Sequence, residues 1–391
     1  MSIGRALKAP AGSFFLWGCR GTGKSTWLKE TYPDAAWFDL LDEALYQRFL
    51  ASPGLFAAEL RSLEPGSRVV VDEVQRLPNL LNEVHRAIEA RGLRFALCGS
   101  SARKLKRAGV NLLGGRALLR RMHPFLPEEI GSAFELEAAL RYGTLPLVWD
   151  SEEPEERLEA YTQLYLKEEI QAEALVRNLQ GFARFLPVVA LFHAQTLNVS
   201  SIARDAGIAR TTVIGYVDIL EETMLTFRVP AFEARLRVRE RRHPKLYWTD
   251  PGILRAARRV RGALHFEERG PLFEGLVGQY LRASMDLYGL CDDLRYWAPQ
   301  RRGDTEVDFL LLRGDRIVAI EVKSGAVFRA EWCKGLRAIR DLDGLVRRII
   351  VTPTARPLVT EDGIELLPFS GLVESVRRGD LFESCSGINL Q

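Results

Sequence analysis

The sequence lacks several features, and each absence excludes a class of protein. No run approaches the roughly 18 consecutive apolar residues of a membrane span, and the amino-terminal segment has no hydrophobic stretch long enough for a signal peptide. The five cysteines show no CxxC spacing and the five histidines do not cluster with them, which argues against zinc sites and a disulfide framework. There is no internal repeat and no low-complexity tract. We therefore expect a cytoplasmic globular protein that does not enter a membrane.

What the sequence does contain is an ordinary globular composition, with 47% hydrophobic and 27% charged residues. Its 391 residues suffice for roughly two to four domains. The net charge of +3 hides an uneven distribution, because residues 235–261 contain ten Lys or Arg against two acids, whereas residues 150–173 are strongly acidic. A basic stretch suits a polyanion such as DNA, but pairing with the acidic segment would explain it equally well.

The clearest motif lies near the start, where the apolar residues 14–17 run into GCRGTGKS at residues 18–25. This matches the pattern G-x-x-x-x-G-K-[ST] in full. Glycines let the backbone curl so that its amides face phosphate oxygens, and the following helix adds the positive end of its dipole. Lys24 would then reach the β and γ phosphates, and Ser25 would bind magnesium. A plain glycine turn is the alternative, but its position between a strand and a helix favours nucleotide binding.

A second acidic motif follows at RVVVDEV, residues 68–74, where an apolar strand ends in Asp72 and Glu73. At this distance from a complete P-loop, the pair is typical of a Walker B motif rather than of surface decoration. Asp72 should hold the magnesium through water, and Glu73 should polarise the attacking water as general base.

Two further strand candidates, residues 36–40 and 95–98, alternate with helical segments, which indicates a parallel sheet whose ligands lie at the carboxyl ends of the strands. Ser100 or Ser101, directly after the second strand, could then sense the γ-phosphate, or could simply cap that strand. The predicted nucleotide-binding residues are Gly18, Gly21, Thr22, Gly23, Lys24, Ser25, Thr26, Asp72 and Ser100.

The stretch EVDFLLLRGDRIVAIEVKSG, residues 306–325, predicts a β-hairpin. A two-residue turn at 314–315 suits Gly-Asp, because glycine accepts positive φ, and it fixes the register of the two strands. Counting outward pairs Phe309 with Ile320 and makes one face of the hairpin wholly apolar. That face should be buried.

The other face of the hairpin brings Asp308 opposite Glu321, and Glu306 opposite Lys323. Directly opposed acids repel each other, so the pair needs a proton or a cation nearby. Carboxylate oxygens suit a hard ion such as Mg²⁺ or Mn²⁺, and Lys323 could stabilise charge developing at a phosphate. A solvated sheet end, in which Lys323 only neutralises its neighbours, remains the alternative.

Residues 199–227 predict a helix-turn-helix, because a short helix, a glycine at 207 and a second helix follow in order. The second helix would present Arg210, Thr211 and Thr212 at its amino-terminal end. Such units also serve as protein-interaction modules. The basic segment that follows from Arg235, where a wing would lie, favours nucleic acid.

Two resemblances to known families extend these predictions. The order of P-loop, DE-type Walker B, GSS and LLGGRALLRRMHPF resembles a family of prokaryotic AAA+ ATPases, in which a helical segment, a winged helix and a PD-(D/E)XK nuclease-like domain follow the ATPase. The resemblance covers nearly the whole chain. It implies that Arg116, in NLLGGR, is an arginine finger reaching a neighbour's nucleotide, although a partner within its own subunit is an equal alternative.

The spacing of Asp308 and Glu321-Val322-Lys323 resembles the metal-binding core of the PD-(D/E)XK nuclease superfamily. That resemblance implies catalytic roles for Asp308, Glu321 and Lys323, with metal held by Asp308 and Glu321. Glu274, in LFEGLVGQYL, looks like the acid that this superfamily often carries on a preceding helix, which implies that Glu274 is a third metal-site residue. Alternatively, Glu274 is an ordinary acid on a helix surface.

We therefore predict an α/β chain with four parts: an AAA+ parallel-sheet domain (1–125), a helical lid or connector (126–195), a winged helix-turn-helix (196–245) and a PD-(D/E)XK nuclease-like domain (246–391). The predicted function is that of an ATP-hydrolysing, DNA-binding protein, using ATP and Mg²⁺, whose carboxy-terminal domain uses Mg²⁺ or Mn²⁺ to cut DNA. The alternatives are an ATP-gated switch that binds DNA or protein without cutting, and a ring-shaped DNA translocase. The resemblance also implies a homo-oligomer, with a hexamer as one such assembly.

Overall fold

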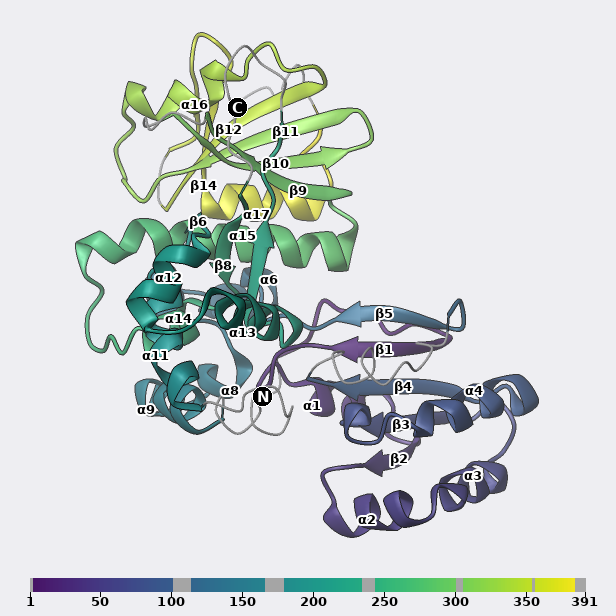
Figure 1. Ribbon diagram of the computed structural model, residues 1–391. Coiled ribbons are helices and arrows are strands. Elements are labelled where there is room, and N and C mark those ends of the chain that lie inside the picture. Colours follow the sequence, from purple (N-terminus) through teal and green to yellow (C-terminus); the bar gives the residue numbers. More distant parts are fainter. Residues whose placement is uncertain are drawn as a thin grey trace.

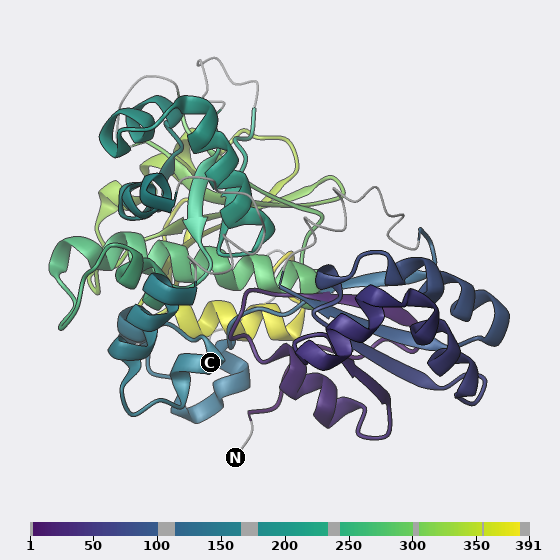
Figure 2. The same ribbon diagram turned by 60° about the horizontal axis from the view of Figure 1, so that its bottom comes forward.

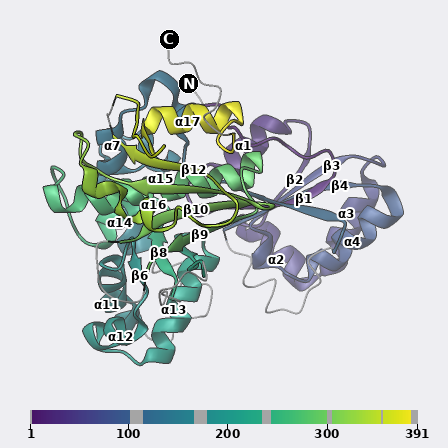
Figure 3. The same cartoon turned by 90° about the horizontal axis from the view of Figure 1, so that it is seen from above.

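The computed structural model describes residues 3–100, 114–165, 179–233, 243–299, 305–353 and 356–383. A sheet near the amino terminus and a second sheet near the carboxy terminus lie at different ends of the molecule, with a mainly helical part between them (Figure 1). Seen from above, the amino-terminal sheet projects to one side of the rest (Figure 3). Within the described residues, no helix combines the length and apolar character needed to cross a membrane.

The amino-terminal sheet has five parallel strands in the order β2-β3-β4-β1-β5. Its strands are β1 (Ser13–Trp17), β2 (Ala36–Asp39), β3 (Arg68–Asp72), β4 (Arg94–Gly99) and β5 (Ala117–Arg121), and its helices are α1 (Lys24–Thr31), α2 (Glu43–Ala51), α3 (Pro53–Ser62), η1 (Val74–Arg76) and α4 (Leu80–Arg91). Strand β3 is buried from Val69 to Asp72, as expected for a parallel strand covered on both faces. The predicted α/β character and parallel sheet are confirmed.

The middle of the chain is helical where it is described, as predicted. It contains α6 (Pro127–Ile130), η2 (Gly131–Ala133), α7 (Leu136–Tyr142), α8 (Pro146–Trp149), α9 (Pro154–Ala160), η3 (Tyr161–Tyr165) and α11 (Leu179–Ala190). Several of these elements are short, and proline occupies the first turn of α6, α8 and α9, where its missing N–H costs no hydrogen bond.

A small unit of two helices and three strands follows. It comprises β6 (Gln195–Thr196), α12 (Val199–Ala206), α13 (Arg210–Glu222), β7 (Thr226–Val229) and β8 (Lys245–Trp248), with the antiparallel strand order β6-β8-β7. Gly207 ends α12 with φ of 63°, a left-handed conformation that glycine adopts without strain. Helices α12 and α13 therefore follow each other across the glycine turn that the sequence predicts. The basic residues 235–242 lie outside the described residues.

The carboxy-terminal part contains a six-stranded mixed sheet in the order β13-β14-β12-β11-β10-β9. Its elements are α14 (Pro251–Ala257), α15 (Phe266–Tyr288), β9 (Asp293–Trp297), β10 (Val307–Arg313), β11 (Arg316–Val322), η4 (Ala330–Cys333), α16 (Lys334–Ala338), β12 (Leu345–Thr352), β13 (Leu358–Val359), β14 (Glu365–Pro368) and α17 (Phe369–Arg378). Strands β10 and β11 pair antiparallel from Phe309–Ile320 to Arg313–Arg316. This is the register that the two-residue turn predicts.

Helix α15 is the element that joins the parts. It has 23 residues and runs beneath the six-stranded sheet, with α17 beside it (Figures 1 and 2). The Phe369 ring of α17 packs edge-to-face on the rings of Phe273 and Tyr280. One apolar cluster includes buried side chains from the amino-terminal sheet, the middle helices and this carboxy-terminal part, so the parts share a core.

Candidate functional site

The P-loop lies between β1 and α1, as the sequence predicts. Gly21 and Gly23 both have φ of 82°, so the chain curls through conformations that favour glycine. The buried Lys24 ammonium donates to the carbonyl oxygens of Gly18 at 2.8 Å and Cys19 at 3.2 Å. The Thr22 hydroxyl donates to the same Cys19 carbonyl at 2.8 Å. The lysine is therefore held inside the loop by main-chain oxygens that a bound phosphate would replace.

Gly18 is required by the close approach of the chain after β5. A Cβ on Gly18 would lie 2.5 Å from the Met122 carbonyl oxygen and 2.9 Å from the Thr22 hydroxyl. The Met122 amide in turn donates to the Trp17 carbonyl at 2.7 Å. The start of the loop is thus fixed against the segment that leads out of the amino-terminal sheet.

The two predicted magnesium-binding residues of the P-loop domain meet directly. The Ser25 hydroxyl donates to the Asp72 carboxylate at 2.5 Å, although the two residues are 47 positions apart. A hydroxyl and a carboxylate are hard oxygen donors, so this pair fits the magnesium of a bound nucleotide. The remaining predicted contact, Thr26, follows Ser25 in the first turn of α1.

Glu73 occupies a strained position beside the loop. Its φ of 55° and ψ of 41° are left-handed, which is uncommon for a residue other than glycine and is typical of functional sites. The Gln75 amide donates to the Glu73 carboxylate and, at 3.1 Å, to the buried Ser100 hydroxyl. The sequence analysis missed Gln75, which links the predicted general base to the predicted γ-phosphate sensor. Ser101 lies outside the described residues.

The middle helices also touch the P-loop. The Leu147 amide of α8 donates to the Gly21 carbonyl at 3.0 Å, and the Tyr161 hydroxyl of η3 donates to the Arg20 carbonyl at 3.1 Å. These contacts join segments more than 120 residues apart, and no local pattern in the sequence signals them. They place the predicted connector directly on the nucleotide-binding loop.

Arg116 lies just before β5 and is half-exposed. Its guanidinium donates to the Glu89 carboxylate of α4 and to the Gly114 carbonyl, the latter at 3.3 Å. Arg116 therefore has a partner within its own chain. A role in trans at a neighbour's nucleotide remains a prediction.

The second predicted site lies at the far end of the β10–β11 hairpin. Asp308 and Glu321 are both buried, with exposures of 2% and 4%. Asp308 accepts a hydrogen bond from the Val322 amide at 2.9 Å, and Lys323 donates to Glu321 at 2.6 Å. Glu274 reaches the same cluster from α15. The predicted residues are brought together, so the solvated sheet end is not what the structure has.

A residue that the sequence analysis missed stands at the centre of this cluster. The Lys245 ammonium, on the neighbouring strand β8, lies 3.0 Å from Asp308, 3.1 Å from Glu274 and 3.3 Å from Glu306. The Tyr247 hydroxyl, two residues along the same strand, donates to Glu274 at 2.6 Å. The only signal of Lys245 in the sequence is its position, as a lysine at the start of the otherwise apolar strand KLYW.

The charges in this cluster shift the pKa values of its members. Burial alone would lower the pKa of Lys245, but the surrounding carboxylates and Tyr247 raise it well above its usual value, so the ammonium stays charged. Burial and the charge of Asp308 raise the pKa of Glu274 to about 7 and that of Glu321 well above its usual range. Burial opposes the lowering of the Asp308 pKa, and Lys245 and Lys323 outweigh it.

A divalent metal does not fit the cluster as it is arranged here. Metal ligands lie about 2.0–2.6 Å from Mg²⁺ or Ca²⁺, and the Lys245 ammonium already occupies the space between the carboxylates. In the part of the chain that the structure describes, no three His, Cys, Asp or Glu side chains are grouped to hold a metal ion.

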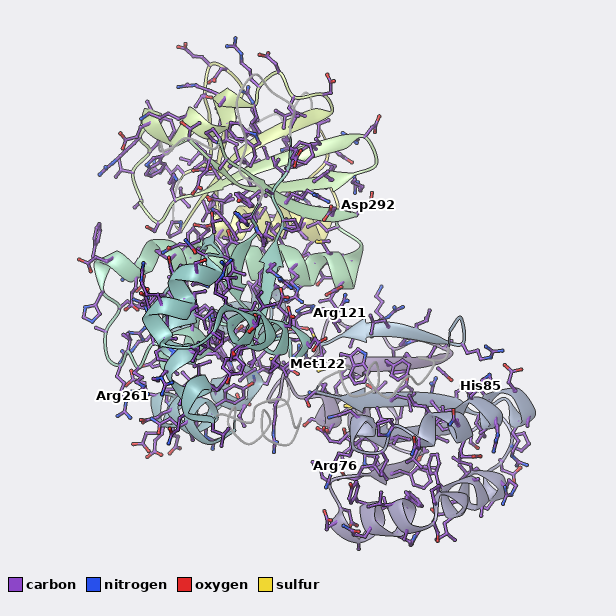
Figure 4. The ribbon with its side chains drawn as sticks, in the orientation of Figure 1. Arg76, His85, Arg121, Met122, Arg261 and Asp292 are labelled. Atoms are coloured by element: carbon purple, nitrogen blue, oxygen red, sulfur yellow. The ribbon has the colours of Figure 1, made fainter. Side chains whose placement is uncertain are left out.

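A third polar cluster connects the P-loop domain to α15. Asp286 accepts from the Arg121 guanidinium at 2.6 Å and from the His123 ring at 2.8 Å. Burial lowers the pKa of His123. Figure 4 shows Arg121 and Met122 where β5 meets the middle of the molecule. Met122 contacts the P-loop, and the next residue, His123, is hydrogen-bonded to α15, the helix that also carries Glu274.

Comparisons with protein families divide the chain into three matched segments. Residues 12–131 match an AAA domain, residues 133–263 match a domain of unknown function (DUF8612), and residues 269–372 match another (DUF4143).

Similar proteins occur in mycobacteria. Uncharacterized protein Rv2008c of Mycobacterium tuberculosis and uncharacterized protein Mb2031c of Mycobacterium bovis are each 25% identical over 327 residues, covering 82% of this chain and 71% of the relative. Among solved structures, protein VC1899 from Vibrio cholerae is 14% identical with a TM-score of 0.25, covering 96% of this chain and 99% of its own.

A signal transduction ATPase with numerous domains (STAND) from Pyrococcus horikoshii is also 14% identical, with a TM-score of 0.20. The match covers 71% of this chain, which spans 44% of the length of that protein. Residues 12–131 thus match an AAA domain in sequence and contain a P-loop and a parallel five-stranded sheet, which is consistent with an AAA-type ATPase.

Proposed function

We propose that this chain hydrolyses ATP and uses its nucleotide state to control DNA binding by the helix-turn-helix unit that follows. The observation that carries the proposal is the meeting of Ser25 and Asp72 at 2.5 Å beside Lys24, within a domain of AAA type. ATP and Mg²⁺ are the cofactors that such a site requires.

At the P-loop, Lys24 would leave the Gly18 and Cys19 carbonyls and neutralise the β and γ phosphates. Magnesium, when bound with the nucleotide beside Ser25 and Asp72, would offset the charge that develops on the phosphates. Glu73 would orient and deprotonate the attacking water, with its carboxylate held by Gln75. Ser100 accepts a hydrogen bond from that glutamine and would register the γ-phosphate.

The route from nucleotide to DNA would run through α15. Met122 contacts the first glycine of the P-loop, and His123 and Arg121 hold Asp286 on that helix. A shift of the loop on binding or hydrolysis of ATP would therefore act on α15. The Lys245 and Tyr247 side chains of β8 contact the same helix at Glu274, so the small unit moves with it.

Three features support DNA as the partner. The order of α11, β6, α12, α13, β7 and β8 is that expected of a winged helix, and the sequence between β7 and β8 is rich in arginine. Arg210 and Thr211 are exposed at the amino-terminal end of α13, where a recognition helix contacts a groove. Binding through arginines to phosphates would be salt-dependent. The same surface could instead recognise a protein, and a DNA-binding assay distinguishes the two partners.

The carboxy-terminal part would serve as a nuclease-like module. Helix α15, the strands β9 to β11, the α16 crossover and the parallel strand β12 follow the order of elements expected from the PD-(D/E)XK resemblance. A homo-oligomer in which the half-exposed Arg116 reaches a neighbour's nucleotide, such as a hexameric ring, belongs to the same proposal.

The test pairs two assays on two variants. Phosphate release from ATP is measured for the wild type and Lys24→Ala, and duplex DNA binding is measured by fluorescence anisotropy for the wild type and Arg210→Ala at two salt concentrations. We expect Lys24→Ala to lose hydrolysis, and Arg210→Ala to bind DNA more weakly with a shallower salt dependence. Absence of ATP hydrolysis by the wild type would contradict the proposed ATPase activity. Absence of DNA binding would contradict the proposed DNA partner and favour a protein partner for the helix-turn-helix.

A further inference from the structure

Strand β8 places two side chains against the acidic cluster of the nuclease-like part. Lys245 and Tyr247 are two residues apart, so they project from the same face of the strand. Both reach Glu274 on α15, and Lys245 continues to Asp308 on β10. Strand β8 belongs to the three-stranded sheet, not to the sheet that carries Asp308. The cluster is thus completed by a neighbouring structural unit.

The ammonium of Lys245 makes as many charged contacts as it has hydrogens. Its three carboxylate partners lie at 3.0 to 3.3 Å, and its exposed fraction is only 2%. An ammonium has three donors and no acceptor, so these partners satisfy it completely. The Tyr296 ring lies 5.5 Å from the same nitrogen and adds a favourable cation–π contact. The geometry is that of a cation bound in a built site.

The cluster contains four carboxyl groups and two lysines. Among the described residues, the cations that act on Glu274, Asp308 and Glu321 are Lys245 and Lys323, which carry one charge each. The Oε2 oxygen of Glu321 is buried and, among the described residues, has no hydrogen-bond partner. Buried carboxylate oxygens without partners are rare and costly. The cluster therefore keeps a buried carboxyl oxygen that neither lysine satisfies, in addition to the oxygens that Lys245 binds.

We propose that Lys245 is a built-in cation that takes the place of a divalent metal, so that the wild-type chain binds no Mg²⁺ or Mn²⁺ at this cluster and a neutral residue at 245 opens a metal site. This inference rests on the proposed nuclease-like module, and it adds that strand β8 keeps the module without metal. A divalent ion would need Glu274 and Asp308 as oxygen ligands, and both are held by the ammonium.

The experiment measures Mn²⁺ binding by electron paramagnetic resonance of the free ion, and thermal unfolding with and without Mn²⁺, in protein without nucleotide. Because Ser25 and Asp72 are the proposed magnesium ligands of the P-loop, every protein carries Ser25→Ala to exclude binding there. The variants are Lys245→Met and, as a matched control, Lys334→Met, which replaces an exposed lysine at the start of α16. We expect Lys245→Met to unfold at a lower temperature than the control, and we expect Mn²⁺ to restore its unfolding temperature. The Lys245→Met protein should bind one Mn²⁺ ion at least about tenfold more tightly than the control binds it.

A second variant covers the case in which three unneutralised carboxylates prevent folding. Lys245→Met with Glu306→Gln removes one lysine and one partly exposed acid, and leaves Glu274 and Asp308 in place. It should bind Mn²⁺ as the single variant does, and adding Asp308→Asn should abolish that binding. The measurement on the parent protein, which carries only Ser25→Ala, also tests the proposal. Mn²⁺ that is bound by this parent and lost in its Asp308→Asn variant would overturn the proposal.

The outcomes separate this inference from the proposed function. Mn²⁺ binding by the Lys245 variants without DNA cleavage supports the role of Lys245 as a built-in cation and argues only against nuclease activity of the opened site. Binding followed by cleavage supports both. Equal Mn²⁺ binding by the parent and the Lys245 variants, or none by either Lys245 variant, overturns the inference, and the ATPase and DNA assays are unaffected.

Discussion

Replacing Asp286 with asparagine should weaken the junction between the P-loop domain and α15. The carboxylate accepts from Arg121 at 2.6 Å and from His123 at 2.8 Å, and its side chain is 19% exposed. Burial opposes ionisation, but the hydrogen bond from His123 and the charges of Arg121 and Arg282 prevail and lower the Asp286 pKa from 3.8 to about 2. This shift corresponds to about 2 kcal/mol of stability at neutral pH.

The stabilisation by Asp286 depends on pH. A carboxyl group whose pKa is lowered on folding stabilises the folded state above its unfolded pKa of 3.8, and this contribution is lost as the pH falls through about 2. Urea denaturation of Asp286→Asn should therefore give a deficit of about 2 kcal/mol at pH 7 that falls to about half at pH 3. The control is Asp341→Asn, whose side chain is 82% exposed and which should cost less than about 0.5 kcal/mol. Equal stability of Asp286→Asn and the wild type at pH 7, or a deficit that does not change with pH, would refute the reasoning.

Three other substitutions test separate parts of the molecule. Glu73→Gln should lower kcat for ATP about 10²- to 10⁴-fold and leave ATP affinity unchanged, as measured by phosphate release and nucleotide titration; an unchanged kcat would assign the base elsewhere. Gly18→Ala should lose binding of a fluorescent ATP analogue because its Cβ would lie 2.5 Å from a main-chain carbonyl oxygen, whereas Gly12→Ala, with open space around it, should bind normally. Arg347→Ala should cost about 3–5 kcal/mol in urea denaturation because it strands the buried Glu365, which it binds at 2.6 and 2.7 Å. Arg347→Met combined with Glu365→Leu should recover most of that loss, and equal losses in both would show that the ion pair itself is the stabilising element.

The sequence predicts those features that depend on neighbours along the chain. The P-loop residues lie within eight positions, and the turn at 314–315 fixes the register of the hairpin from Phe309 to Arg313. Ser25 and Asp72 are distant in sequence but occupy the carboxyl edge of one parallel sheet, so the βα pattern places both. Local periodicity and sheet topology are sufficient for these assignments.

The features that the sequence did not predict arise from contacts between separate structural units. Lys245 reaches Asp308 across 63 positions, from a strand of another sheet, and nothing near either residue indicates the contact. Leu147 and Tyr161 reach the P-loop in the same way. Gln75 is adjacent to the Walker B acids, yet its role depends on the side chain of Ser100, which comes from β4. Tertiary packing, which the pattern of apolar residues does not specify in detail, determines each of these.

The most direct test of the account is the change in DNA affinity that nucleotide produces, compared between the wild type and Asp286→Asn. Anisotropy titrations of a labelled duplex are run with and without a non-hydrolysable ATP analogue at one fixed salt concentration. If α15 transmits the nucleotide state, the analogue should change the wild-type Kd at least about fivefold and change that of Asp286→Asn by less than about twofold. The same ratio in both proteins would contradict the account.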